Sequence, residues 1–548
     1  MLAKDGAALT TRVSVPDERL EAGPKGHRVH VIDFDASTNA YYQPRDTALD
    51  TDHYVDVTDL DRLIRDPYFH QQNVYAIAMA TLCEFQRALG RPVSWGFANP
   101  SHQLKIAPHA FAQANAYYSR KSESLSFGYF PGTRANKTIF TCLSHDVIAH
   151  ETTHALLDGL RNFFTYPSSP DQGAFHEGFS DVIALLSVFK SVELIERSLA
   201  PVTDRRNLVH SKYLDVETLG NNVLIKLADQ LGDELKPVRG EPLRHSIKLK
   251  PSPEYLKQDE FQEAHRRGEI LVAALMHAFL EVWLRRLGPI GLDRKIPLNR
   301  TVVAEEGATA ARHLMRIAIR GLDYLPPIDM KFGDYLSALL TADSELNPDD
   351  TRYAYREALT LWFGQYGITP ASDKNPDGIW DPPRAKDLVY GSSHFEHLQR
   401  DADAVFRFIW ENGAALAIEP DAFTRVVSVR PCIRVSRDGF ILRETVAEYV
   451  QTLKVFANEL GAFGIEKPAG IGRSAFITLY GGGTLIFNEY GQVKFHIGKG
   501  VKSTKQTDRL QSLYERGYFN RDEGDSSDFA RLHQRRMTHR ITSAGEQW

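Results

Sequence analysis

Two histidines and a glutamate stand close together in SHDVIAHETTHALLDGL, residues 144–160. His150 and His154 are four residues apart, which on an α-helix is about one turn and places both rings on one face. At that spacing both imidazoles can reach one metal ion, and Glu151 then faces the open coordination position. Such an ion lowers the pKa of a bound water toward about 7, and a glutamate can accept the released proton. The pattern therefore indicates metal-dependent hydrolysis.

A third ligand is available further along the chain, and catalytic zinc usually has three protein ligands and one exchangeable water. The segment DQGAFHEGFSDVIALL, residues 171–186, has helical spacing and offers Glu177 on its first turns. Asp181 follows one turn later on the same face, where a carboxylate can accept the outer N–H of a ligand histidine. We therefore expect one zinc ion per chain, bound by His150, His154 and Glu177.

Each of these residues also has an interpretation without a metal. The two histidines could be core residues whose ring nitrogens bond backbone carbonyls. Glu177 could stabilise the start of its helix through the helix dipole, as carboxylates often do. Asp181 could lie on a solvated helix face, although Phe179 and Val182 beside it favour burial. The residues taken alone leave these alternatives open.

HETTH followed by GAFHEGFSD resembles the thermolysin family of zinc metalloendopeptidases, which pairs HExxH with a downstream G-A-x-x-E-x-x-S-D helix. The likeness covers four segments in the family's order, within roughly residues 28–366. It implies a two-lobed α+β fold, with a mixed sheet-and-helix N-terminal lobe and a mainly helical C-terminal lobe. It also implies a hydrolase of the gluzincin type, in which a water bound to zinc and activated by Glu151 cleaves peptide bonds.

The resemblance assigns further residues to the site. Residues 113–119 (QANAYYS) resemble the family's substrate-binding edge strand, and residues 240–246 (GEPLRHS) resemble its substrate-binding arginine segment. Residues 265–279 (HRRGEILVAALMHAF) resemble the helix whose first histidine stabilises the oxyanion. The implied roles are catalytic for His265 and Tyr166, orienting for Asp259, and substrate-binding for Asn115, Ala116, Arg244, Phe140, Leu143, Val147 and Leu243.

These implied roles have alternatives as well, and parts of the sequence depart from the family. His265 could face solvent, Arg244 could pair with a surface acid, and the aromatic and apolar residues could serve only in packing. Asp146 matches a calcium-binding aspartate of the family, but Val188 stands where a second carboxylate is needed, which argues against the double calcium site. Cys142 is interpreted as a small buried hydrophobe rather than a nucleophile.

The elements that must position these residues follow from apolar periodicity. We predict strands at 28–35, 103–111 and 124–130, and helices at 72–89, 143–160, from about 174, 265–287, 304–320, 333–345 and 350–366. Residues 367–390 are rich in Pro, Asp and Gly and mark a boundary. Beyond it we predict a helix near 400–412, a strand at 424–435, a helix at 444–460 and a β-meander at 476–498.

Five regions result from this pattern. They are a polar N-terminal tail (1–26), an N-terminal lobe with the edge strand and the HExxH helix (27–172), a mainly helical lobe with the third zinc ligand (173–370), an accessory α+β domain (371–521) and a polar tail (522–548). The tail at 1–26 has no apolar segment of the signal-peptide kind, and no later run approaches the length of a membrane span. We therefore expect a cytoplasmic protein.

Composition limits the function classes that remain. The chain has 548 residues, of which 43% are hydrophobic, and a net charge of −5 with both signs interspersed, which gives no electrostatic case for nucleic acid or an anionic membrane. Two hypotheses remain: an intracellular zinc endopeptidase, or a catalytically weak zinc protein whose C-terminal domain recognises a protein partner. Glu151 favours the enzyme, since a scaffold has no physical need for that base.

Overall fold

The computed structural model describes residues 12–44, 54, 57, 59–97, 102–132, 138–166, 168–220, 246, 248–372, 375–383, 387–391, 394–435 and 439–520. Its helices include α1 (Leu60–Arg65), α2 (Pro67–Leu89), α3 (His145–Leu160), α4 (Pro170–Phe189), α5 (Val192–Leu199), α6 (Val216–Leu219), α9 (Ala264–Leu287), α10 (Arg300–Gly321), α11 (Phe332–Leu346), α12 (Tyr355–Gln365), α13 (Phe395–Leu398), α14 (Ala402–Glu411) and α15 (Gln506–Glu515). Its strands include β1 (Val29–Val31), β2 (Phe34–Asp35), β3 (Ala40–Tyr41), β4 (Leu104–Phe111), β5 (Ala116–Ser119), β6 (Ser124–Pro131), β7 (Thr138–Phe140), β8 (Leu208–Val209), β9 (Leu298–Asn299), β10 (Phe423–Val435), β11 (Ile441–Phe456), β12 (Phe476–Asn488) and β13 (Val493–Lys499).

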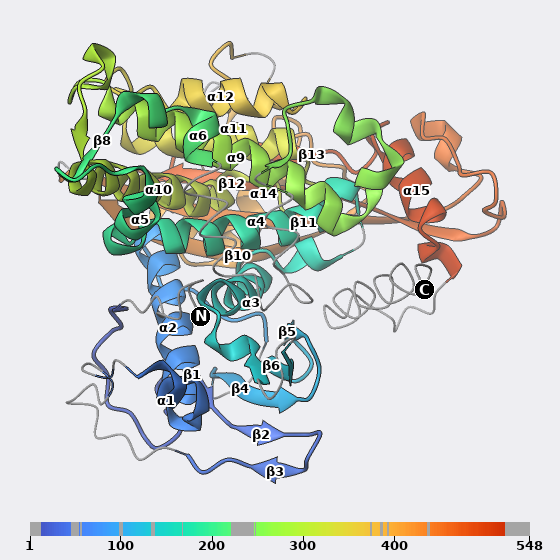
Figure 1. Ribbon diagram of the computed structural model, residues 1–548. Helices are drawn as coiled ribbons and strands as arrows, with labels where there is room; N and C mark the ends of the chain where they lie inside the picture. The colour runs from blue at the N-terminus through green and yellow to red at the C-terminus, as the bar shows by residue number, and fades with distance from the viewer. Residues whose placement is uncertain are drawn as a thin grey trace.

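The chain combines long helices with two separate main sheets, which agrees with the predicted α+β class. The N-terminal sheet has the order β1-β4-β6-β5, in which β1, β4 and β6 run parallel and β5 pairs antiparallel to β6 at the edge. In Figure 1 this sheet lies below, the long helices α4, α9 and α10 lie above, and α3 lies between them. The predicted edge strand at 113–119 is thus found as β5, beside the HExxH helix.

The ends of α2 show how local sequence sets one of these helices. Asp66 caps its start by accepting the N–H of Tyr68, and Pro67 occupies the first turn. Gly90 ends it with φ of 67°, a left-handed conformation that favours glycine. A Cβ at Gly90 would also lie 2.1 Å from the carbonyl oxygen of Ile433. This glycine therefore lets strand β10 of the C-terminal region approach the end of α2.

The prediction of a helix at 444–460 is wrong, because this segment forms most of β11. β11 lies in the middle of a four-stranded antiparallel sheet of order β10-β11-β12-β13. Its residues from Glu444 to Gln451 are all buried, since both faces of the strand are covered. A strand buried on both faces loses the alternation of apolar and polar residues that identifies a half-exposed strand. The β-meander predicted at 476–498 is confirmed as β12 and β13.

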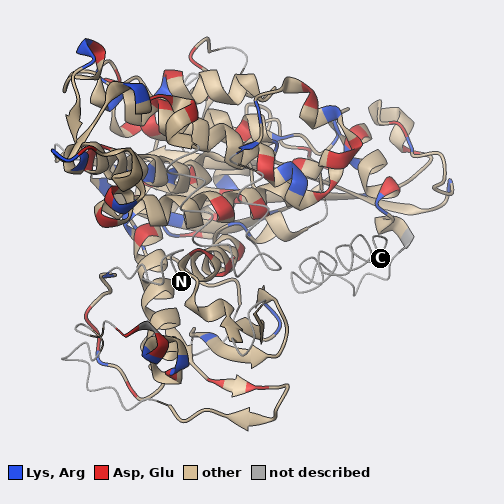
Figure 2. Cartoon of the chain, in the orientation of Figure 1, with Lys and Arg blue, Asp and Glu red and all other residues tan. Residues whose placement is uncertain are grey.

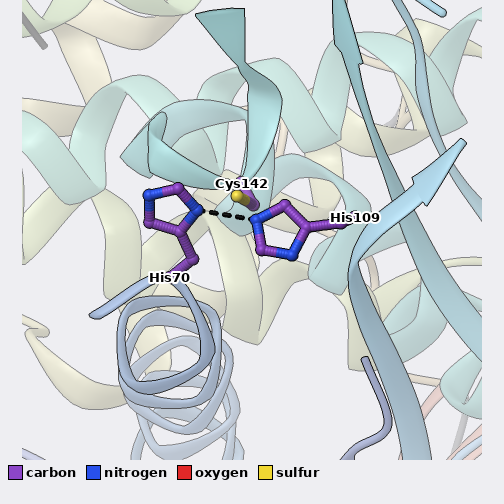
Figure 3. A group of neighbouring side chains, drawn as sticks. All are labelled: His70, His109 and Cys142. Carbon is purple, nitrogen blue, oxygen red and sulfur yellow. Dashed lines mark hydrogen bonds between the residues drawn. The ribbon is translucent and has the colours of Figure 1, made fainter. Parts of the chain in front are cut away.

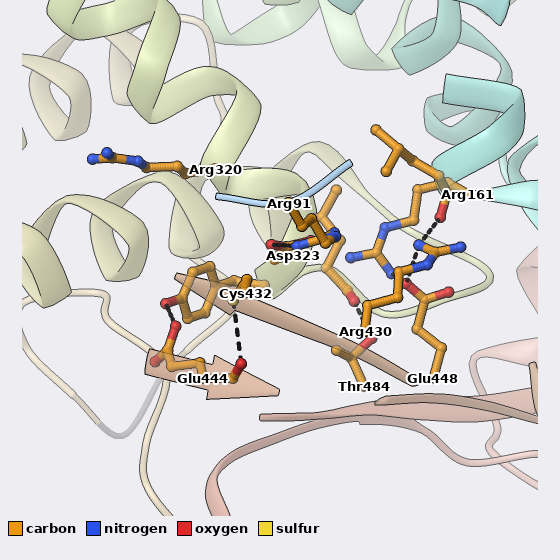
Figure 4. A network of polar contacts seen from close by, with 12 residues as sticks. Arg91, Arg161, Arg320, Asp323, Arg430, Cys432, Glu444, Glu448 and Thr484 are labelled. Carbon is orange, nitrogen blue, oxygen red and sulfur yellow. Dashed lines mark hydrogen bonds and ion pairs between the residues drawn. The ribbon is translucent and has the colours of Figure 1, made fainter. Parts of the chain in front are cut away.

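The C-terminal sheet is packed against the helical region. Ile486, Phe495 and Ile497 belong to the same hydrophobic cluster as the cores of α4, α9 and α10. Trp380, in the predicted boundary segment, donates its indole N–H to the carbonyl of Tyr324 at 2.9 Å. Buried polar contacts add to this interface and join the end of α3 to strands β10 and β11 (Figure 4). Residues 423–499 therefore help to hold the helices that carry the candidate site.

The N-terminal segment is packed onto the rest of the protein. Residues 18–26, predicted as part of a polar tail, contact the body of the protein, since Glu18 accepts hydrogen bonds from the Tyr75 hydroxyl and the His27 N–H.

Figure 2 shows basic and acidic residues interspersed over both the sheet and the helical regions. Among the described residues, no helix is both long enough and apolar enough to span a membrane.

Candidate metal centre

Helix α3 is buried along nearly its whole length although it is rich in polar residues. It packs against helices α2 and α4 and against strand β5. Thr152 and Thr153 satisfy their hydroxyls within the helix, because each donates to the carbonyl four residues earlier at 2.7 Å. The buried imidazoles and carboxylate of this helix need partners from other elements.

Helix α4 supplies one of those partners. Ser169 caps the helix by accepting the N–H of Gln172, and Pro170 occupies its first turn. The helix therefore begins four residues earlier than the predicted start near 174, and Glu177 lies two turns inside it rather than on the first turns. Since helix-dipole stabilisation falls off within the first turn, it does not account for this buried carboxylate.

His150 and His154 of α3 and Glu177 of α4 converge between the two helices. One donor atom from each residue lies within 4.8 Å of the other two, and all three side chains are buried. His150 Nε2 is 3.6 Å from Glu177 Oε2, and His154 Nε2 is 3.7 Å from Glu177 Oε1. A tetrahedral ion with bonds of about 2.0–2.2 Å would separate its donors by about 3.3–3.6 Å. These three residues can therefore hold such a metal ion with little movement.

The outer nitrogens of both histidines are also engaged. His150 Nδ1 lies 2.6 Å from Asp181 Oδ1, which directs Nε2 toward the site. His154 Nδ1 lies 2.8 Å from His176 Nδ1 and 3.2 Å from the Ser180 hydroxyl. Such contacts fix the ring orientation of metal-binding histidines. The geometry gives Asp181 the orienting contact that the sequence predicted for it.

Electrostatics at the centre favour the protonation states that metal ligands need. Burial lowers the pKa of His154, so its ring is neutral at physiological pH. Burial raises the pKa of Glu177, but the neighbouring His265 and the hydrogen-bonding rings of His154 and His150 outweigh this effect and hold the pKa well below its usual value. The centre therefore presents a neutral imidazole at His154 and an ionised carboxylate at Glu177.

Glu151 connects the HExxH helix to the edge strand. Its Oε2 accepts the backbone N–H of Tyr118 in β5 at 3.1 Å. Two turns later on the same helix, Asp158 accepts the hydroxyl of Tyr118 at 2.7 Å and forms an ion pair with Arg120. The candidate base and the candidate substrate-binding strand are thus held together by buried polar contacts.

His265 reaches the centre from α9 because α9 and α4 approach closely. A Cβ on Gly178 of α4 would lie 2.8 Å from the carbonyl oxygen of Gly268 in α9, so the contact depends on glycine. His265 Nε2 lies 3.4 Å from Glu177 Oε2, and its Nδ1 lies 2.7 Å from Glu263 Oε1.

The predicted orienting partner of His265 therefore needs correction. Asp259 is exposed in the 3-10 helix Asp259–Gln262, and the contact comes from Glu263, the N-cap residue of α9. An N-cap is held against the first turn of its own helix, so Glu263 is already placed beside His265. The prediction of an acidic partner for His265 was therefore right in type, but the partner is Glu263, four residues after the predicted Asp259.

The remaining predicted residues lie in different surroundings. Ala116 is buried in β5, and the half-buried Asn115 lines a cavity of 540 Å³ with Gln113 and Tyr117. Tyr166 is 45% exposed, and its ring lies 6.4 Å from that of Tyr480 in β12. The structure therefore places Tyr166 at the surface where the C-terminal sheet approaches the loop before α4.

The predicted apolar residues share no single role. Val147 is buried in α3, whereas Leu143 is only partly buried. Phe140 packs its ring against His70 and His109, at centroid distances of 4.8 and 5.4 Å. Arg244 and Leu243 lie outside the described residues.

Three residues with clear contacts at the centre were not assigned these roles from the sequence. His176, directly before Glu177, contacts His154. Tyr118 acts through its backbone N–H, for which no side-chain pattern gives a signal. Glu263 could have been found from its position just before the helix at 264–287, where an acidic N-cap is common.

Comparison with known proteins gave no relative to guide the assignment, since neither the protein-family models nor the curated proteins contain a match to this chain. Any functional assignment therefore depends on the chemistry and geometry of the described residues.

Proposed function

We propose that this protein is a zinc-dependent peptidase of the thermolysin type, with His150, His154 and Glu177 as the zinc ligands. The observation that carries the proposal is the convergence of these three buried side chains from α3 and α4. Two imidazoles and one carboxylate are a donor set of catalytic zinc, which keeps its fourth position for water or substrate.

Glu151 is the proposed proton carrier. A zinc ion in this site would supply a Lewis acid that lowers the pKa of a coordinated water toward about 7. Glu151 follows ligand His150 directly and is fully buried, so its carboxylate can take a proton from the attacking water. It can then hand that proton to the leaving nitrogen of the cleaved peptide.

The edge strand and His265 complete the proposed site. An edge strand can bind an extended peptide through backbone hydrogen bonds, with side-chain pockets giving specificity, and β5 occupies such an edge beside α3. His265, held by Glu263, can stabilise negative charge on the carbonyl oxygen as it develops. Peptides and proteins are therefore the proposed substrates.

The alternative is a catalytically weak zinc protein that acts through partner recognition. Binding of zinc needs the three ligands but not Glu151, and a fully buried carboxylate costs free energy unless it has partners. Its contact with the backbone of β5 places this carboxylate between the ligands and the candidate peptide-binding strand. That position favours the enzyme.

The test compares Glu151→Gln with wild type after zinc has been measured in both. Glutamine keeps the shape of the side chain but cannot accept a proton, so we expect normal zinc content and peptide cleavage slower by about 10²–10⁴. Glu193→Gln is the matched control, since Glu193 lies in an exposed ion pair with Arg197 on α5. Zinc-loaded wild type that cleaves nothing in a proteome-derived peptide library, or full activity of Glu151→Gln, would contradict the proposal.

A further inference from the structure

A second group of potential metal ligands lies in the N-terminal region. His70 in the first turn of α2, His109 in β4 and Cys142 in the 3-10 helix Thr141–Leu143 each offer one atom within 4.8 Å of the other two. All three residues are 2% exposed or less. Figure 3 shows the two rings facing each other, with the sulfur of Cys142 beside the dashed contact. The three segments are far apart in sequence and share no residue with the centre proposed above.

Hydrogen bonding fixes which nitrogen of each ring carries a proton. His70 Nε2 lies 3.0 Å from the carbonyl of Ile64, and a carbonyl can only accept. His109 Nδ1 lies 2.9 Å from a carboxylate oxygen of Asp33, which in its ionised form can also only accept. Both protons are therefore on the outer nitrogens, so in two neutral rings the inner nitrogens carry lone pairs.

These inner nitrogens face each other at close range. His70 Nδ1 and His109 Nε2 are 2.7 Å apart, where two lone pairs repel. Either a shared proton or a metal ion between the rings removes this repulsion. The thiol of Cys142 favours the metal ion. A shared proton needs no third donor atom beside the two nitrogens, whereas a metal ion does. Oxygen acceptors on the outer nitrogens of both rings are also the usual surroundings of metal-binding histidines.

We propose that His70, His109 and Cys142 bind a thiophilic divalent metal ion, zinc or copper, that links α2, β4 and the segment leading into α3. Two imidazoles and a thiolate suit both metals. The carboxylate of Asp33 and the thiolate would bring two negative charges into a buried site, and a divalent ion neutralises them. Bonds of about 2.0 Å to a tetrahedral ion require the inner nitrogens to separate to about 3.3 Å, a small shift of the rings.

The consequence is structural and does not depend on peptide hydrolysis. Cys142 stands three residues before the start of α3, the helix that carries His150, Glu151 and His154. Gln71 in α2 donates to the second oxygen of Asp33 at 3.0 Å, so the partner of His109 is itself held in place. An ion here would therefore tie the N-terminal sheet to the start of the HExxH helix.

The first test uses the full-length wild-type protein, so that it does not depend on the folding of a variant. The metal-free protein is loaded with Co²⁺ and, separately, with Cu²⁺, and the absorption of thiolate-to-metal charge transfer is recorded. The ligands of the first centre include no cysteine, so any such band requires a thiolate elsewhere. We expect the band in wild type, its loss in Cys142→Ser, and no change in Cys432→Ser, a matched control for another buried cysteine.

Metal content gives the second test. We expect two metal ions per chain in wild type, one in Cys142→Ser and one in His150→Ala, with the remaining ion of His150→Ala still giving the thiolate band after cobalt exchange. Folded wild type that shows no thiolate band with either metal, or unchanged metal content in Cys142→Ser, would overturn the proposal in favour of the shared proton. Loss of the first centre leaves the thiolate band in place, so failure of the proposed function and failure of this site can be told apart.

Discussion

Replacement of Glu448 by glutamine should destabilise the protein strongly, because this carboxylate joins the C-terminal sheet to the end of the HExxH helix. Arg161, which follows α3, places one guanidinium nitrogen 2.7 Å from Glu448 Oε1. Arg430 of β10 lies 3.7 Å from the same oxygen and donates to the carbonyls of Leu160 and Gly159, at 2.9 and 3.3 Å. The last turn of α3 is thus capped by the C-terminal sheet.

The magnitude follows from burial. The side chains of Arg161 and Glu448 are 1% and 4% exposed, and removal of one partner from a buried ion pair typically costs about 3–5 kcal/mol. Nearby carboxylates give little compensation, since Asp323 is already held by Arg91 and Arg434, and Glu444 by Arg434 and Lys494 (Figure 4). We expect the full 3–5 kcal/mol for Glu448→Gln, a large part of the about 5–15 kcal/mol of an ordinary domain.

Urea unfolding of wild type and Glu448→Gln measures this loss directly. Glu254→Gln is the control, because Glu254 and Lys257 form an exposed pair that should contribute at most about 1 kcal/mol. The double variant Arg161→Met with Glu448→Gln should lose less free energy of unfolding than the sum of the two single variants. Each single change leaves the other charge of the pair buried alone, whereas the double change removes both charges. If Glu448→Gln unfolds at the same urea concentration as the control, the C-terminal sheet does not stabilise α3 through this contact and the reasoning is refuted.

Three further outcomes are expected. Asp181→Ala should keep the fold but weaken zinc by about 10–100-fold in a competition titration, because His150 loses its orienting partner; unchanged affinity would contradict this. Zinc chelators should lower the midpoint of thermal unfolding far more than calcium removal does, since Val188 cannot ligate a cation that needs oxygen. A large rise of this midpoint on addition of calcium would contradict the prediction. Burial opposes the charge of Asp323, but two arginines hold its pKa well below the usual value. This stabilisation is present above the unfolded pKa of about 3.9 and is lost as the pH falls through the folded value. The difference in urea midpoint between wild type and Asp323→Asn should therefore narrow below about pH 4, and a constant difference would argue against the assignment.

Short-range patterns predicted the parts of the centre that lie on single helices. The spacing of His150 and His154 needs only the period of α3, and Asp181 follows Glu177 by one turn of α4. Each relation is set within one helix, where periodicity fixes which side chains share a face. The start of α4 was placed four residues too late because its first turn, PDQG, carries no apolar signal.

Contacts between distant segments could not be predicted in this way. The pairing of His70 with His109 depends on how α2 docks on β4, and neither segment alone indicates it. The strand β11 was predicted as a helix because burial on both faces removes its period of two. That error also concealed Glu448, which lies on β11 and meets α3 only in the folded protein.

The burial of α3 on every side has a physical consequence for the proposed chemistry. Catalytic groups need positions accurate to about 0.5 Å, and such accuracy comes from neighbours that lock each side chain. Asp181 orients one ligand, Tyr118 holds the candidate base, and Arg430 caps the last turn. These contacts come from α4, β5 and β10, three elements that are separate in the sequence. Strand β10 therefore supports the proposed site without touching a proposed ligand, because Arg430 binds the last carbonyls of the helix that carries two of the three proposed ligands.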